Sequence, residues 1–170
     1  MKIENQHGIA TKPDYEMWQP PELFNLNTEK NEPILEFKSN AELRGCLKYW
    51  QNILYLNDWI FSSSLDDAEN MLINGKPQAG TNHLDFTHKA SVISIARRTT
   101  TTEERIVKVP HEIVLVHELL HCKYNWIGGE SYEKLYVEET EHALLDQMAR
   151  SLIMAKYRLT PEWFNNVQDD

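Results

Sequence analysis

The segment from Pro110 to Tyr124 constrains the fold of this chain more than any other part of its sequence. Proline is favoured at the first position of a helix, and the residues that follow are apolar on nearly every side of a helix. These apolar residues are Ile113, Val114, Leu115, Val116, Leu119 and Leu120. A helix with so little polar surface belongs in the centre of a domain, so we expect the other elements to be built around it.

Three ionisable residues interrupt this apolar helix in the pattern H-E-x-x-H. His117 and His121 are four residues apart, which places them on one helical face about 6 Å apart. Two imidazole nitrogens at that spacing can bind one Zn²⁺. Glu118 is rotated by about 100° from His117, so it lies beside the metal, where it can serve as general base toward a zinc-activated water. Unpaired charge among apolar residues is costly, which favours a bound metal over two solvated histidines.

A catalytic zinc site needs a third protein ligand and keeps a fourth position for water. The candidates lie in residues 136–142, near the start of the last predicted helix. In a helical projection the apolar face of that helix is centred near Glu141, with Glu138 and His142 on either side. Glu139 points to the polar side. We predict Glu138 as the third ligand, with His142 one turn later as its partner; Glu141 is the first alternative and His142 the second.

Two further helices are predicted, one on each side of the strand region. The first covers about residues 40–56, with Asn40 as a plausible N-cap. Its apolar face consists of Leu43, Cys46, Leu47, Trp50 and Leu54. The last helix covers about residues 131–157. Its apolar face is predicted from Leu144, Leu145, Met148, Leu152 and Ala155.

Three strands are predicted between the first helix and the H-E-x-x-H helix. They are Trp59–Ser64, Pro77–His88 and Ser91–Ala96, with a hairpin turn around residues 87–89. We therefore expect an α+β fold with a small three-stranded sheet. The strand Ser91–Ala96 could present an open edge to an extended peptide, or it could be a core strand with no role in binding substrate. Three candidates for a donor to a transition-state oxyanion stay open, namely Tyr132, Tyr136 and His88.

The chain is predicted to form one domain with an arm and a tail. Residues 1–39 contain several prolines and are expected to be a partly ordered arm, residues 40–160 the domain, and residues 161–170 a tail. The residues through which the arm would pack, or dock on a partner, are Trp18, Leu23 and Phe24.

Composition excludes several classes of function. The formal net charge of -9 argues against a nucleic-acid partner, because phosphate binding needs a surplus of Lys and Arg. No apolar run approaches the roughly 20 residues that a membrane span requires, and no apolar core follows the N-terminal lysine as in a secretory signal. Cys46 and Cys122 form no C-x-x-C pair, which favours reduced thiols and a cytoplasmic location.

Several of these segments together resemble a known group of proteins. Residues 48–59, 90–96 and 112–121, followed by the acidic start of the last helix, are similar to small zinc metallopeptidases of phages and prophages. These are related to the minimal zincin families that include the ImmA/IrrE-type and SprT-like proteins. The resemblance covers about residues 41–157, and the sequence H-E-L-L-H is its specific part.

The resemblance implies a minimal zincin-like fold and an activity. An N-terminal helix and a small antiparallel or mixed sheet would support the H-E-x-x-H helix, and a long C-terminal helix would supply the third zinc ligand, usually Glu in the ImmA/IrrE type. It implies a gluzincin-like zinc metalloendopeptidase that acts on a peptide or protein substrate. Tyr124 and Ile127 stand where the extended motif H-E-x-x-H-x-x-G-x-x-H requires Gly and His, which excludes a metzincin.

A rival hypothesis keeps the zinc and removes the catalysis. The chain would then be a non-catalytic, zinc-binding interaction or regulatory protein of phage origin on a zincin scaffold. Glu118 favours the enzyme, because a purely structural zinc site needs no general base and fills its fourth position with a protein ligand.

Overall fold

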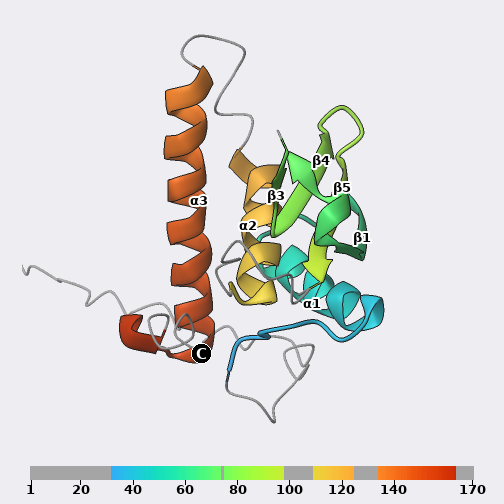
Figure 1. Ribbon diagram of the computed structural model, residues 1–170. Coiled ribbons are helices and arrows are strands. Elements are labelled where there is room, and N and C mark those ends of the chain that lie inside the picture. The colour runs from blue at the N-terminus through green and yellow to red at the C-terminus, as the bar shows by residue number, and fades with distance from the viewer. Residues whose placement is uncertain (1–31, 74, 98–108, 125–133, 164–170) are drawn as a thin grey trace, which may run out of the picture.

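The computed structural model describes residues 32–73, 75–97, 109–124 and 134–163, with side chains of the last range described from residue 140 onward. These residues form a mixed structure of helices and strands, which agrees with the predicted α+β class (Figure 1). In chain order the elements are α1 (Asn40–Ile53), β1 (Ile60–Asp67), the 3-10 helix η2 (Ala68–Asn70), β2 (Leu72–Ile73), β3 (Lys76–Pro77), β4 (Gly80–Asp85), β5 (Ala90–Arg97), α2 (His111–Tyr124) and α3 (Lys134–Tyr157).

The three main strands form one mixed sheet in the order β1-β5-β4. β5 pairs in parallel with β1 and antiparallel with β4, while β2 and β3 form a separate two-stranded ribbon. The open edge predicted for Ser91–Ala96 is therefore wrong, and the alternative of a core strand is confirmed. Those residues belong to β5, whose backbone is paired on both sides. Its β-branched residues Ile93 and Ile95 are fully buried, as expected of a central strand.

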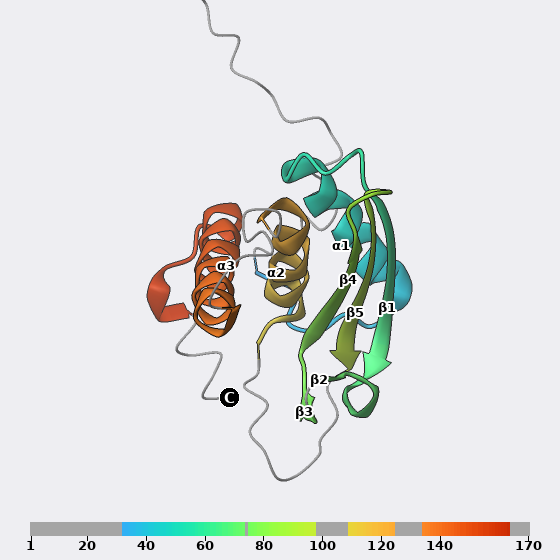
Figure 2. The same ribbon diagram turned by 90° about the horizontal axis from the view of Figure 1, so that it is seen from above.

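α2 lies between the sheet and α3, so the molecule has its H-E-x-x-H helix in the middle (Figure 2). α1 packs against both β1 and α2. Every residue from His111 to Val116 is buried, and so are Leu119 and Leu120. The prediction of a central, buried helix is confirmed. Among the described helices, none is long and apolar enough to cross a membrane.

α1 begins as predicted, but a different residue forms its N-cap. Ser39 is the N-cap, and its hydroxyl accepts a hydrogen bond from the Glu42 N–H. The side chain of Asn40 instead accepts a hydrogen bond from the Leu65 N–H at 2.8 Å. The predicted cap was therefore wrong by one residue, because the side-chain oxygen of Asn40 is already hydrogen-bonded to β1. The helix ends at Ile53, and Tyr55 then adopts a left-handed conformation with φ 54°.

α3 packs against α2 on a narrower face than the sequence predicts. Leu145, Ala149 and Ile153 are buried, whereas Leu144 is 53% exposed and Ala155 is also exposed. The prediction was wrong for Leu144 and Ala155. Among the described helices and strands, α3 packs chiefly against α2 (Figure 2), so its buried stripe is narrow and an apolar residue at its margin stays in solvent.

The chain segment before α1 packs against the first turn of α2. The N–H groups of His111 and Glu112 donate to the carbonyl oxygens of Leu35 and Ile34, each at 3.1 Å. Phe37 is buried, and its N–H donates to Nδ1 of His111. The arm residues Trp18, Leu23 and Phe24 lie outside the described residues.

Candidate metal centre

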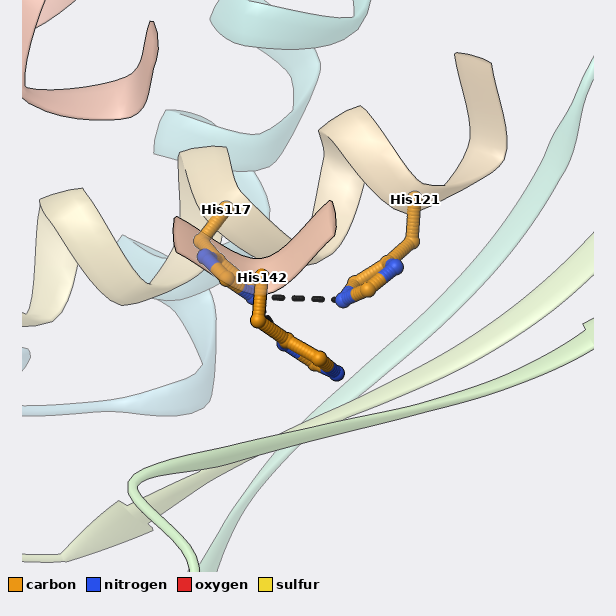
Figure 3. A group of neighbouring side chains, drawn as sticks. All are labelled: His117, His121 and His142. Carbon is orange, nitrogen blue, oxygen red and sulfur yellow. Dashed lines mark hydrogen bonds between the residues drawn. The ribbon is translucent and has the colours of Figure 1, made fainter. Parts of the chain in front are cut away.

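Three histidines from two helices converge on one point (Figure 3). His117 and His121 come from α2 and His142 from α3. One ring nitrogen of each lies within 4.8 Å of those of the other two, and these are the described side chains able to hold a metal ion together. Nε2 of His117 is 3.2 Å from Nε2 of His121 and 3.3 Å from Nδ1 of His142.

These separations fit a tetrahedral metal. Imidazole nitrogens bind zinc at about 2.0–2.1 Å, and two ligands of a tetrahedron at that bond length are about 3.3 Å apart. Both nitrogen–nitrogen distances from His117 match this value. The donor set of three imidazoles also suits zinc among the common divalent metals.

Carboxylates on α3 face the other nitrogen of the two α2 histidines. Nδ1 of His117 lies 2.9 Å from Oδ1 of Asp146, and Nδ1 of His121 lies 3.9 Å from Oε1 of Glu141. A carboxylate as close to Nδ1 as Asp146 is to His117 favours the tautomer that carries its proton there, which leaves the Nε2 lone pair free for a metal. The separation of 3.9 Å between Glu141 and His121 is too long for a hydrogen bond. Oε1 of Glu141 is buried and has no hydrogen-bond partner among the described residues. Nδ1 of His117 is likewise buried without an aligned hydrogen bond, so Asp146 acts on His117 as an ion-pair partner at short range.

The electrostatic environment makes His121 a neutral ligand. Burial, together with the charges of His117 and His142, lowers the pKa of His121 to about 4. For His117, burial lowers the pKa, but the carboxylates of Asp146 and Glu118 more than offset this and leave it raised. The contact with His117 in turn lowers the pKa of Asp146. Asp146 therefore stays ionised, as a partner for His117 requires.

Glu118 is buried beside the three histidines and is not one of the group. Burial raises its pKa to about 7, and the neighbouring His117 partly counteracts this. The carboxylate lies against the backbone of Gly80 at the start of β4: a Cβ atom at that position would come within 2.6 Å of Oε1 of Glu118. Glu118 thus occupies a space that β4 leaves open by having no side chain there.

The structure brings together part of the predicted site. His117 and His121 meet as predicted, and His142, the second alternative for the third ligand, joins them. Glu141 is outside the group and faces His121 instead. The side chain of Glu138 lies outside the described residues, so its assignment as third ligand stays a prediction.

The three candidate oxyanion donors stay candidates, and two residues of the site were not predicted from the sequence. The side chains of Tyr132 and Tyr136 lie outside the described residues, while His88 lies in the β4–β5 turn and pairs with Asp85 at 2.7 Å. Asp146 and Gly80 were missed. Asp146 was accessible from sequence, because it follows His142 by one helical turn and must share its face.

Comparisons with profiles of known protein families give no match to this chain, and none is found among curated proteins or solved structures. The function is therefore inferred from the geometry of the site itself.

Proposed function

We propose that this protein is a zinc-dependent metallopeptidase that hydrolyses peptide bonds in a peptide or protein substrate. The observation that carries the proposal is the convergence of three imidazole nitrogens, with both distances from His117 at tetrahedral spacing, beside a buried carboxylate. Three protein ligands leave one position of a tetrahedral zinc for water, which distinguishes a catalytic from a structural site. Zinc held there supplies a Lewis acid and an activated water at neutral pH.

Glu118 would act as the general base and then as the general acid. Its carboxylate takes one proton as water adds to the carbonyl carbon of the scissile bond. It then gives that proton to the leaving amine nitrogen as the carbon–nitrogen bond breaks. A pKa of about 7 suits both tasks at neutral pH.

The free edge of β4 is the proposed place for the substrate backbone. The N–H of Ala96 donates to the carbonyl of Ala79, so alternate residues from 79 onward pair with β5. The N–H and C=O groups of Gly80, Asn82 and Leu84 then point away from β5, to the edge where no described strand pairs with them. β1, at the opposite edge, is less available because Asn40 already occupies the N–H of Leu65. An extended peptide could add to β4 beside Glu118.

One observation favours the non-catalytic alternative. The buried Oε1 of Glu141 has no hydrogen-bond partner among the described residues, and it lies near His121. A carboxylate from α3 that completed the zinc coordination would close the fourth position and make the site structural. The protein would then be a zinc-stabilised interaction protein of phage origin. In either case the buried thiols of Cys46 and Cys122 favour a cytoplasmic location.

A metal analysis combined with a cleavage assay tests the proposal. The purified protein should contain about one zinc per chain, and His117→Ala should lose it. Glu118→Gln should keep the zinc and lose cleavage of a peptide library by about 10²- to 10⁴-fold. The exposed Glu69→Gln is the matched control and should change neither. Zinc binding without cleavage in the unsubstituted protein would favour the interaction protein, and absence of zinc after its addition would refute both.

A further inference from the structure

The side chain of Asn82 connects the free edge strand to the H-E-x-x-H helix. Asn82 lies in β4 with its side chain toward α2, and its Nδ2 donates to the main-chain oxygen of Glu118 at 2.6 Å. Its Oδ1 accepts a hydrogen bond from the hydroxyl of Ser91 in β5 at 2.7 Å. Both ends of the amide are therefore used, which fixes its orientation. Nδ2 also lies 3.5 Å from Sγ of Cys122.

The backbone of the same residue belongs to the free edge. Ser91 is 2% exposed, so the hydroxyl that orients Asn82 is held inside the sheet-to-helix interface. Two positions earlier, Gly80 brings the β4 backbone into contact with the Glu118 carboxylate. Glu118 is thus approached by β4 at two points, its carboxylate by Gly80 and its carbonyl by Asn82.

We propose that Asn82 is a positioning residue that holds the free edge of β4 at a fixed distance from the Glu118 carboxylate. This inference rests on the proposed peptidase function. A peptide paired along β4 would then have its backbone at a fixed distance from the carboxylate of the general base. The Asn82 side chain would set that distance without touching the substrate. The sensitivity of catalysis to such placement is large, because a displacement of about 1 Å can cost on the order of 10²-fold in rate.

Asn82→Asp is the sharpest test, because it keeps the shape of the side chain. It replaces the donor Nδ2 by an oxygen, which would face the Glu118 carbonyl oxygen and repel it. We expect kcat/KM for a hexapeptide, which is long enough to pair along β4, to fall about 10- to 100-fold with one zinc per chain retained. Ser91→Ala removes only the orienting hydroxyl and should give a loss of a few-fold. His83→Gln, on the exposed face of the same strand, should have no effect.

Comparing substrates of different length distinguishes a positioning role of Asn82 from a general loss of folded protein. A short dipeptide substrate cannot pair along the strand, so Asn82→Asp should reduce its cleavage far less than that of the hexapeptide. A purely structural role would reduce both in the same proportion, and this result would overturn the proposal. Should Asn82→Asp not fold, the same length comparison on Ser91→Ala decides the matter.

A second readout does not depend on cleavage. In the zinc-loaded protein, Asn82→Asp should accelerate amide hydrogen exchange in residues 80–85 and weaken binding of a non-cleavable hexapeptide, with exchange in α3 unchanged. If the unsubstituted protein cleaves no peptide, the proposed peptidase function fails and this readout still judges Asn82. Unchanged exchange and unchanged hexapeptide binding in the variant would refute the positioning role.

Discussion

At the scale of single residues, Gly80 is the described glycine at which an added side chain would meet a direct clash. A Cβ atom there would lie 2.6 Å from both Oε1 of Glu118 and Cγ1 of Val114. Gly80→Ala should therefore destabilise the protein by about 1–3 kcal/mol, because β4 and α2 must move apart to admit the methyl group. Urea denaturation of the zinc-loaded protein measures this effect.

Gly45 provides the matched control for Gly80. It lies inside α1, and a Cβ atom added there meets nothing within 4 Å. Gly45→Ala should stabilise the protein by about 0.5–1 kcal/mol, since alanine loses less backbone entropy in a helix. Opposite signs for the two substitutions support the close approach of β4 to Glu118; equal effects would contradict it.

The third metal ligand is also a question of single residues. His142→Ala should weaken zinc binding strongly, because it removes one of the three converging nitrogens. Asp146→Asn should weaken it by about 10- to 100-fold, because His117 loses the carboxylate that orients its ring. Competition with a chromophoric chelator measures both affinities. A larger loss in Glu138→Ala than in His142→Ala would make Glu138 the ligand.

At the scale of elements, the buried carboxylate of Glu112 holds the three helices together. It is fully buried and accepts hydrogen bonds from Trp50 Nε1 of α1 and from Lys156 and Tyr157 of α3. It also accepts one from the N–H of Ile34. Burial and the Glu112 charge raise the pKa of Tyr157, so its hydroxyl remains a donor throughout the neutral range. The sequence alone gave no reason to single out this glutamate.

Glu112→Gln should therefore destabilise the protein by roughly 2–4 kcal/mol, because the ammonium group of Lys156 loses its charged partner. Tyr157→Phe removes one hydrogen bond and should cost about 1 kcal/mol. Both values come from denaturant unfolding. If Glu112→Gln were no more destabilising than Tyr157→Phe, the network would add nothing beyond its individual hydrogen bonds.

The elements also show which parts of the fold a sequence can reveal. α1 and α2 were predicted well because their patterns are local: apolar spacing, a proline at the start of α2, and an H-E-x-x-H motif whose geometry follows from helical rotation. The order of the strands was not predictable in this way. The pattern of Ser91–Ala96 indicates a strand, and β4 pairs with it through a short turn. Whether it lies at an edge depends on β1, which pairs with its other side from a distant part of the chain.

At the scale of the whole molecule, a bound metal would join α2 to α3. Chelation should lower the thermal unfolding temperature, because a ligand that binds only the folded state stabilises it by about 3–4 kcal/mol at 100 to 1,000 times its dissociation constant. The loss should be absent in His142→Ala, in which the link between the helices is already missing. Calorimetry with and without chelator measures it. A chelator effect that persists fully in His142→Ala would place the metal on α2 alone.

The two attachments of α3 to α2 also restrict which insertions and deletions evolution can tolerate between them. His142 converges with His117 and His121, and Lys156 pairs with Glu112. At 1.5 Å per residue, His142 and Lys156 are about 21 Å apart along the helix. Inserting or deleting one residue in 143–155 would rotate the second attachment by about 100° relative to the first, so one of them would be lost. The length of that segment is thus as restricted as the spacing within H-E-x-x-H. Descendants of this chain should vary in its residues and keep its length.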